Sequence, residues 1–260
     1  MIAKNMIEKG DFSALADDYT KYRPSYSKMI VDLIFGTTNK PNNEVVAADV
    51  GAGTGIFTKL LLDKNPNELY AVEPNENMRL AGEKFLPNGV KWRSAGAEST
   101  GLPSNTFDLI SMASSFHWPN TDLALKEFNR VLKSSGIFVA LWNPRITELS
   151  DTESIIDNIL TNEYSVKSRV SSGRSGITVN LTNILKNSNY FADVSYLETT
   201  NKVCVSPERY IGAWRSVNDI RSQLGEENFT NFIDKVTNIV GNMEHVEVHY
   251  MTRAWVARKI

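Results

Sequence analysis

Three alternating glycines and two carboxylates are the residues of this chain whose spacing best suits ligand chemistry. Gly51, Gly53 and Gly55 follow an apolar run that ends in Asp49 and Val50. Glycines in such a turn can adopt positive φ and present no Cβ, so a ligand can lie against bare backbone. Glu73 comes roughly 20 residues after the first glycine, where a carboxylate can accept both hydroxyls of a ribose. The pattern predicts a nucleotide-like ligand.

The spacing of the glycines distinguishes between two such ligands. The dinucleotide fingerprint is G-x-G-x-x-G, whereas here the third glycine comes one residue early and Ile56 takes its place. Asp49, two residues before the loop, would repel a pyrophosphate. It would suit an ammonium or a sulfonium-bearing amino acid, through charge-assisted hydrogen bonds. The residues therefore favour a sulfonium amino-acid ligand over NAD, and a glycine turn without a ligand is the alternative.

These residues need elements that bring them to one edge of a sheet. Alternating strands and helices are typical of a parallel sheet with helices on both faces. The expected fold is therefore an α/β doubly wound sheet, in which ligands bind at the carboxyl ends of the strands. Strands are expected at residues 45–50, 68–72, 90–93, 107–113 and 137–142, with helices at 56–62, 75–85 and 121–132.

The last part of the chain is less regular. Helices are expected at 154–162 and 181–189, and the Ser- and Gly-rich residues 165–176 are expected to form a loop. Two further strands, 194–205 and 245–258, enclose a helical stretch at about 206–242 that opens on Ser206 and Pro207. Such a stretch would form a cap over the carboxyl ends of the strands.

Composition limits the functional classes. The chain has 260 residues, 42% of them hydrophobic, which suits a single domain. Within it we expect an N-terminal lid at 1–40, a cofactor-binding core at 41–145 and a C-terminal half at 146–260. The net charge of −2 gives no general attraction to nucleic acid. The single cysteine, Cys204, excludes an internal disulfide and a zinc constellation and fits a cytoplasmic setting. Without a signal peptide or a long apolar run, no membrane association is expected.

The glycine loop and the middle of the chain resemble class I S-adenosylmethionine-dependent methyltransferases. Residues 49–55 resemble the first motif of that class. Residues 95–103 and 107–118 look like the third and fourth motifs of its type 11 small-molecule branch, to which trans-aconitate methyltransferase-like enzymes are related. Residues 19–24, 129–136 and 250–255 are similar to other segments of the family. The resemblance implies a Rossmann-like, seven-stranded, mostly parallel sheet, and it is specific from about residue 19 to residue 143.

The resemblance also implies where the cofactor binds. Asp49 and the glycine loop would hold its methionine part, Glu73 its ribose, and Pro74 and Met78 would pack near the adenine. Many relatives have an acid at Gly96 that accepts from the adenine amino group, so here Ala97, Glu98 or packing must replace it. The implied cofactor-binding residues are Tyr19, Asp49, Gly51, Ala52, Gly53, Glu73, Pro74, Met78, Ala97, Glu98 and Ser114.

The catalytic candidates follow from the chemistry of an activated methyl group. Alignment of the acceptor matters most, and a general base is needed only if the acceptor must lose a proton. His117, at the expected edge of the sheet, is the candidate base, or else it orders its own loop. Tyr22 and Arg23, with Tyr19, form either a lid in which Arg23 binds an anionic group or a surface helix end. Asn143 is expected to orient a polar substrate.

Three further residues have two interpretations each. Trp142 is either a substrate contact or a core residue, and Arg145 either a substrate contact or solvent-exposed. Trp214, in the expected cap, either reaches into the pocket or packs in the core, which is the commoner role of an aromatic at helical spacing.

The predicted function is methyl transfer from S-adenosylmethionine to a small polar metabolite, with an acidic one among the options. O-methylation is favoured over N-methylation. The alternatives are an RNA methyltransferase, which should show a basic face, and a non-catalytic cofactor-binding subunit. The predicted product is S-adenosylhomocysteine, no metal is expected, and the chain is expected to be a monomer or a homodimer.

Overall fold

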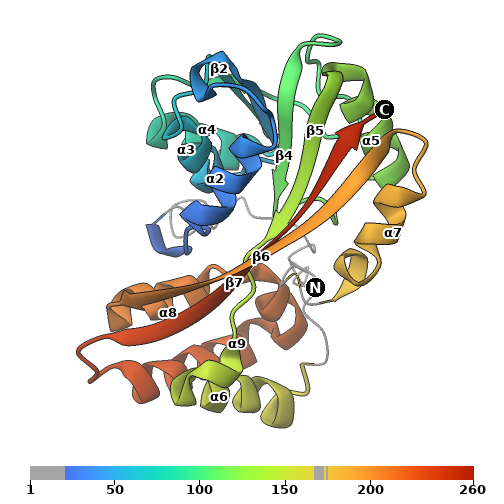
Figure 1. Ribbon diagram of the computed structural model, residues 1–260. Helices are drawn as coiled ribbons and strands as arrows, with labels where there is room; N and C mark the ends of the chain where they lie inside the picture. The colour runs from blue at the N-terminus through green and yellow to red at the C-terminus, as the bar shows by residue number, and fades with distance from the viewer. Residues whose placement is uncertain (1–20, 167–172, 174) are drawn as a thin grey trace, which may run out of the picture.

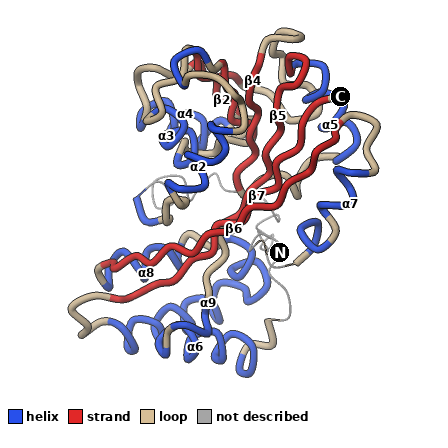
Figure 2. Tube along the Cα trace, in the orientation of Figure 1, coloured by secondary structure: helices blue, strands red, loops and turns tan. Residues whose placement is uncertain are grey.

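A computed structural model describes residues 21–166, 173 and 175–260. These residues contain a seven-stranded sheet of order β3-β2-β1-β4-β5-β7-β6 (Figures 1 and 2). The strands are β1 (Val46–Val50), β2 (Glu68–Val72), β3 (Lys91–Arg93), β4 (Phe107–Ala113), β5 (Leu132–Trp142), β6 (Phe191–Val205) and β7 (Val246–Lys259). Strands β1 to β5 pair in parallel, and β7 runs antiparallel to β5 and β6. The predicted doubly wound α/β sheet is confirmed.

Helices cover both faces of this sheet (Figure 1). The α-helices of the described residues are α2 (Lys28–Gly36), α3 (Ile56–Leu62), α4 (Glu76–Phe85), α5 (Thr121–Val131), α6 (Asp151–Asn158), α7 (Leu181–Lys186), α8 (Pro207–Arg215) and α9 (Asn218–Val240). Of these, α6, α8 and α9 pack in an apolar cluster of their own. Successive side chains of a strand point to opposite faces. Ala47 accordingly packs with α2 and α3, whereas Ala48 packs with α5 and α7. Burial on both faces explains why β1 and β4 read as apolar runs rather than alternating ones.

Side-chain caps fix where several helices begin. The Asn75 side chain accepts a hydrogen bond from the Met78 amide at 3.0 Å at the start of α4. Asn120 accepts from the Leu123 amide at 3.1 Å at the start of α5. At the start of α8, Ser206 caps the helix and Pro207 follows it, as the sequence predicted. Such caps satisfy amides that a helix leaves unpaired at its first turn.

Strands β6 and β7 extend well beyond the other strands and carry the cap (Figure 1). Helices α8 and α9 lie between these strands in sequence, so the predicted helical insertion is confirmed. Helix α6 joins them in an apolar cluster that includes Trp214, Phe232 and Val248. Strand β7 thus serves two cores, because Val248 packs in the cap and Trp255 packs with the sheet.

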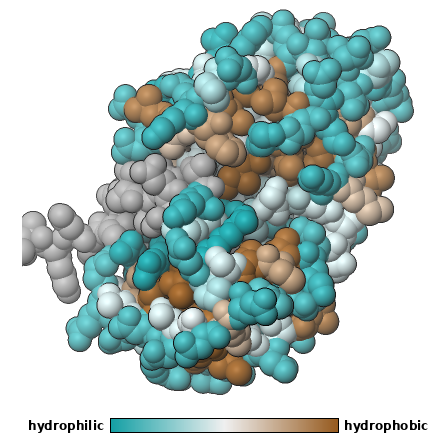
Figure 3. Space-filling view, turned by 90° about the vertical axis from the view of Figure 1, so that its left-hand side faces the viewer, coloured by the Kyte–Doolittle hydropathy of each residue, from teal (hydrophilic) through white to brown (hydrophobic). Residues whose placement is uncertain are grey.

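The surface has apolar areas on both the sheet-bearing part and the cap, as the side view shows (Figure 3). No helix within the described ranges is long and apolar enough to cross a membrane. Of the expected loop at 165–176, residues 167–172 and 174 lie outside the described residues, as do residues 1–20 of the expected lid.

Candidate active site

A cavity of about 530 Å³ lies where the carboxyl ends of the parallel strands face the cap. One end, here called the loop end, is lined by the glycine loop, Glu73, Met78 and residues 96–98. The opposite end, here called the cap end, is lined by Arg23, Asn143, Arg145, Val217, Asn218, Asp219 and Tyr250. Residues from at least six separate segments therefore meet at one site, at the edge of the sheet where this architecture binds ligands.

The glycine loop needs glycine for two separate reasons. Gly51, Gly53 and Gly55 have φ values of 67°, 58° and 85°, which side chains other than glycine's rarely allow. A Cβ on Gly51 would also lie 2.7 Å from Ser115 Oγ. The Gly51 and Ala52 amides donate to the Val72 carbonyl at 2.8 and 3.1 Å, which holds the loop against the end of β2.

Glu73 follows β2 directly and reaches the glycine loop. Its carboxylate accepts hydrogen bonds from the Gly53 and Asn75 amides, both at 2.8 Å. Burial raises the pKa of Glu73 above its usual range, although these two amides act in the opposite direction. The side chain lines the cavity while only 7% of the residue is exposed. A carboxylate held in this way is preorganised to accept ligand hydroxyls.

Asp49 lies beneath the glycine loop and does not line the cavity. It is fully buried, and its carboxylate accepts from Thr58 Oγ1 at 2.7 Å and from Ser111 Oγ at 2.8 Å. Burial raises the pKa of Asp49 to about 6, against the effect of these two hydroxyls. The sequence suggested direct contact with an ammonium; in the structure the carboxylate instead ties β1, β4 and α3 together under the loop.

The apolar part of the loop end is formed by Pro74, Met78 and Ala97. Beside it, Glu98 Oε1 accepts from the Asn120 amide at 2.8 Å. A Cβ on Gly96 would lie 3.3 Å from Glu98 Oε2, so the Glu98 carboxylate occupies the space beside Gly96. An acid is therefore present at this end of the cavity even though position 96 is a glycine.

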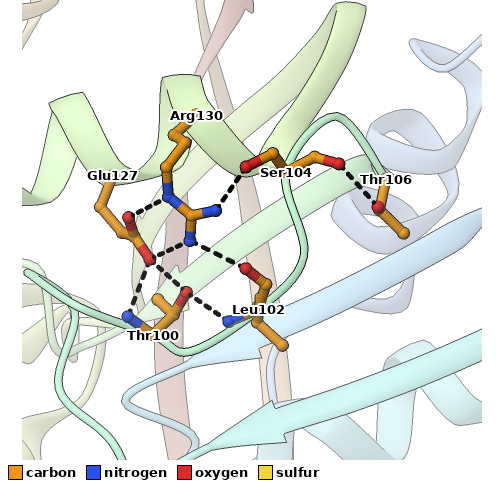
Figure 4. Close-up of polar contacts among 6 residues, drawn as sticks. All are labelled: Thr100, Leu102, Ser104, Thr106, Glu127 and Arg130. Carbon is orange, nitrogen blue, oxygen red and sulfur yellow. Dashed lines mark hydrogen bonds and ion pairs between the residues drawn. The ribbon is translucent and has the colours of Figure 1, made fainter.

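The loop that follows Glu98 is anchored by side chains of α5 (Figure 4). Glu127 accepts from the Thr100 amide at 2.9 Å and from its Oγ1 at 2.6 Å. Arg130 donates to Glu127 and to the Leu102 carbonyl at 2.8 Å. Burial alone would raise the pKa of Glu127, but Arg130 and Thr100 lower it below its usual range. No motif in the sequence indicates this anchor, because its two halves lie in separate segments of the chain.

The segment of residues 21–27, here called the strap, crosses from the cap to the sheet. Arg23 lines the cavity and donates to Ser216 Oγ at 2.9 Å and to the Ser216 carbonyl at 3.0 Å. The Tyr22 ring packs on Gly212, where a Cβ would approach to 2.5 Å, and so borders a smaller neighbouring cavity instead. Tyr19 lies outside the described residues. Of these three expected residues, the structure brings Arg23 to the site.

Arg145 lies in a buried aromatic cage at the cap end. Its guanidinium is 4.1 Å from the Trp214 ring centroid and 5.1 Å from that of Tyr210. It forms an ion pair with Glu153 at 3.6 Å, and Glu153 accepts from the Tyr210 hydroxyl. Burial is the largest single effect and lowers the pKa of Arg145, but Glu153, Tyr250 and Tyr210 together outweigh it and keep the pKa above its ordinary value. A permanent cation therefore lines this end, where the sequence also allowed a solvent-exposed arginine.

The ends of β4 and β5 differ in what they place at the site. Asn143 lines the cap end, whereas Trp142 is buried in the sheet core. Ser114 also lines the cavity. The His117 ring lies 4.5 Å from the Trp118 ring and 6.3 Å from the Trp142 ring, and it is not among the lining residues. The expected base is thus not among the residues that line the cavity.

Several lining residues were not identified from the sequence. Tyr26, Asn218 and Asp219 line the cavity, and Asp219 is 8% exposed. None of them belongs to a motif with a known chemical spacing. They reach the site because the strap and the cap fold onto the strand ends, which no local pattern indicates.

Comparisons with known proteins agree with this geometry. The methyltransferase domain family matches residues 48–140. A methyltransferase-like protein of Schizosaccharomyces pombe is 33% identical over 139 residues, 54% of each chain. A putative methyltransferase of Dictyostelium discoideum is 28% identical over 147 residues, 55% of this chain and 54% of its own. The chain therefore spans about half the length of the curated relatives it matches.

Solved structures share the fold over a longer stretch. A putative type II methyltransferase from Anaeromyxobacter dehalogenans superposes with a TM-score of 0.67 at 18% identity, covering 91% of this chain and 98% of its own. An N-methyltransferase from Haemonchus contortus, solved with S-adenosylhomocysteine, has a TM-score of 0.55 at 12% identity, covering 95% and 57%. The bare glycine loop, the buried Glu73 and the apolar Met78 fit such a nucleoside. Residues 48–140 are therefore similar to the methyltransferase domain family, and the chain shares the fold of solved methyltransferases.

Proposed function

We propose that the chain transfers the methyl group of S-adenosylmethionine to a carboxylate of a small polar acceptor, giving a methyl ester. The observation that carries this proposal is the pair of guanidinium groups, Arg23 and Arg145, at the cap end of the cavity. Arginine is suited to carboxylates because its planar donors can form two parallel hydrogen bonds. An acidic acceptor would thus be attracted to the end of the cavity opposite the ribose site.

The types of side chain that line the cavity support the same class of acceptor. Among the described residues that line the cavity there is no histidine, lysine or cysteine. A carboxylate is already deprotonated at neutral pH and needs no base, whereas an alcohol must lose a proton on methylation. The position of His117 away from the lining is consistent with an acceptor that needs no base.

The proposed mechanism is mainly one of alignment. Bound S-adenosylmethionine supplies an activated methyl group. Glu73 and the glycine loop hold the cofactor, while Arg23 and Arg145 orient the acceptor carboxylate towards it. The strap and the cap exclude water from between them. Alignment of this kind can lower a barrier by about 7–11 kcal/mol.

An amine acceptor is the second candidate, and Asp219 favours it. This carboxylate lines the cap end and is 8% exposed, so it could bind an ammonium group. The two candidates differ in the product, because a methyl ester is cleaved by mild alkali and an N-methyl group is not. The net charge of −2 gives an RNA acceptor no comparable support.

The test uses methyl-labelled S-adenosylmethionine with three acceptor pools: small polycarboxylic acids, small amines and bulk tRNA. We expect label in the acid pool, released as methanol by mild alkali. Arg23→Met should reduce this labelling by about tenfold or more, since it removes a charged hydrogen bond, while Arg215→Met, at an exposed position of α8, should not.

Three results would contradict the ester proposal. Alkali-stable label on amines would support N-methylation, and label on tRNA that falls with salt would support an RNA substrate. Cofactor binding in a calorimeter without label in these pools or in a cell extract would indicate a cofactor-binding subunit.

A further inference from the structure

The strap is fixed most firmly on either side of Tyr26. The Ser25 carbonyl accepts from Asn143 Nδ2 at 3.1 Å. The Ser27 amide donates to Thr252 Oγ1 at 3.0 Å, and Thr252 in turn donates to Asn143 Oδ1 at 2.8 Å. These bonds join the strap to the end of β5 and to the middle of β7. The backbone around Tyr26 is therefore part of the sheet edge rather than a separate lid.

The Tyr26 side chain is fixed as well. Its ring packs edge-to-face on Phe57, with centroids 5.1 Å apart and planes at 74°. Its hydroxyl forms a hydrogen bond of 2.9 Å with Ser114 Oγ, in which either oxygen can be the donor. Phe57 belongs to the first turn of α3, directly after the glycine loop, and Ser114 follows β4. Both hydroxyl-bearing residues line the cavity, beside the loop that holds the cofactor.

Ser114 adopts a backbone conformation that is rare for its type. Its φ is 53°, in the left-handed region that favours glycine. Its amide donates to the Leu141 carbonyl at 2.7 Å, which holds the end of β4 against β5. Strained backbone of this kind persists where the surroundings fix it, and it is found preferentially at functional sites. Here it accompanies the hydroxyl that bonds Tyr26.

We propose that the hydroxyl pair of Tyr26 and Ser114 recognises the positive sulfonium of the cofactor and so discriminates S-adenosylmethionine from S-adenosylhomocysteine. This inference rests on the proposed function, because it assigns residues to the cofactor of that reaction. Hydroxyl oxygens carry partial negative charge, and fixed dipoles act more strongly in a partly buried site than in water.

The charge on the sulfur atom changes during the reaction, and this change determines how strongly the hydroxyl pair binds the ligand. When the methyl group leaves for the acceptor, the sulfonium takes up the electron pair of the broken bond and becomes a neutral thioether. The hydroxyl pair then loses the charge that it binds, while the glycine loop and Glu73 keep their contacts with the rest of the molecule. Binding of the donor is thus favoured relative to binding of the spent product.

Calorimetry on the full chain with each of the two ligands tests the proposal. Tyr26→Phe should weaken S-adenosylmethionine binding by about three- to tenfold and S-adenosylhomocysteine binding by less than about twofold. Ser114→Gly should do the same, and it relieves the backbone strain while it removes the hydroxyl. Tyr70→Phe is the matched control, since the Tyr70 hydroxyl donates to Glu68 at 2.9 Å and the residue does not line the cavity.

The outcomes separate this proposal from the proposed function. Equal weakening of both ligands by Tyr26→Phe and Ser114→Gly, or no change in either, would overturn the role of the hydroxyl pair and leave the methyltransferase proposal intact. Failure of the unaltered chain to bind either ligand would overturn both. The proposal would also be overturned if Tyr70→Phe changed the ratio of the S-adenosylmethionine and S-adenosylhomocysteine affinities by the same amount, because the Tyr70 hydroxyl is outside the cavity.

Discussion

The two ends of the cavity are built in opposite ways. The loop end consists of segments that all lie between Gly51 and Glu98, held by backbone hydrogen bonds such as those from Gly51 and Ala52 to Val72. The cap end consists of side chains from the strap, from the end of β5 and from the cap, and Arg23 and Asn218 come from opposite ends of the chain. The first kind of site depends on local geometry, and the second on how distant segments pack.

This difference has consequences for mutation. A substitution at the loop end should act through backbone strain or steric clash, and it should mainly lower the affinity for the cofactor. A substitution at the cap end should act through the packing of the cap and should leave cofactor affinity largely unchanged. The following experiments test this contrast in order of expected effect.

The largest effect is expected from Arg145→Met. The change leaves Glu153, which is 1% exposed, as a buried charge without its partner. Loss of one partner of a buried pair typically costs about 3–5 kcal/mol, so urea unfolding should show a loss of this size. The double variant Arg145→Met with Glu153→Gln should recover at least about 1 kcal/mol, because no charge remains unpaired. A drop in S-adenosylmethionine affinity as large as the loss of stability would contradict the separation of the two ends.

A smaller effect is expected from Gly51→Ala. Its Cβ would meet Ser115 Oγ at 2.7 Å, and the φ of 67° is strained for alanine. Together, strain and clash should lower the free energy of unfolding by about 2–4 kcal/mol. Gly101→Ala is a close control, because Gly101 has a φ of 66° and nothing within 4 Å of its Cβ position. It should cost about 1–2 kcal/mol from strain alone. Equal losses would show that the contact with Ser115 is unimportant.

The same contrast explains what the sequence could and could not predict. The strands, the cap and the cofactor loop are predictable because they depend on local alternation, glycine spacing and caps such as Asn75. The face of the sheet to which Asp49 points is not predictable, because both faces of a parallel sheet are buried. Thr58 and Ser111 come into contact with the Asp49 carboxylate only after folding. The burial of Arg145 is equally unpredictable, since it requires Trp214 and Glu153 from other elements.

Asp49 also gives the loop end a dependence on pH. Its pKa rises to about 6 on folding from the ordinary value of 3.8, so the folded chain disfavours the ionised form. The stability contribution of this group is therefore full below pH 3.8 and is lost as pH rises to about 6. Relative to Asp49→Asn, the unaltered chain should lose about 2 kcal/mol of unfolding free energy between pH 4.5 and pH 8.

Urea unfolding at several pH values measures this difference. Asp63→Asn, which removes an exposed carboxylate at the end of α3, is the control. A pH-independent difference between the unaltered chain and Asp49→Asn would mean that the Asp49 carboxyl does not titrate in this range.

The smallest effect is expected from Thr252→Val, which tests the attachment of the strap. The change removes the hydroxyl that accepts from the Ser27 amide and donates to Asn143 Oδ1, while keeping the shape of the side chain. The loss of stability should be about 1 kcal/mol, the size of an ordinary buried hydrogen bond. Thr199→Val is the matched control, because Thr199 pairs directly with Thr252 across β6 and β7 and its Oγ1 has no hydrogen-bond partner among the described residues.

Removing the Thr199 hydroxyl should therefore be neutral or slightly stabilising. The two variants have the same chemistry, the same strand pair and the same loss of one oxygen, so the difference between their unfolding free energies isolates the bond to the strap. If that difference were zero, the strap would not be held by the sheet edge. Tyr26 would then be held in position by Phe57 and Ser114. The contrast between a cap end built by distant packing and a loop end built by local geometry would be weaker.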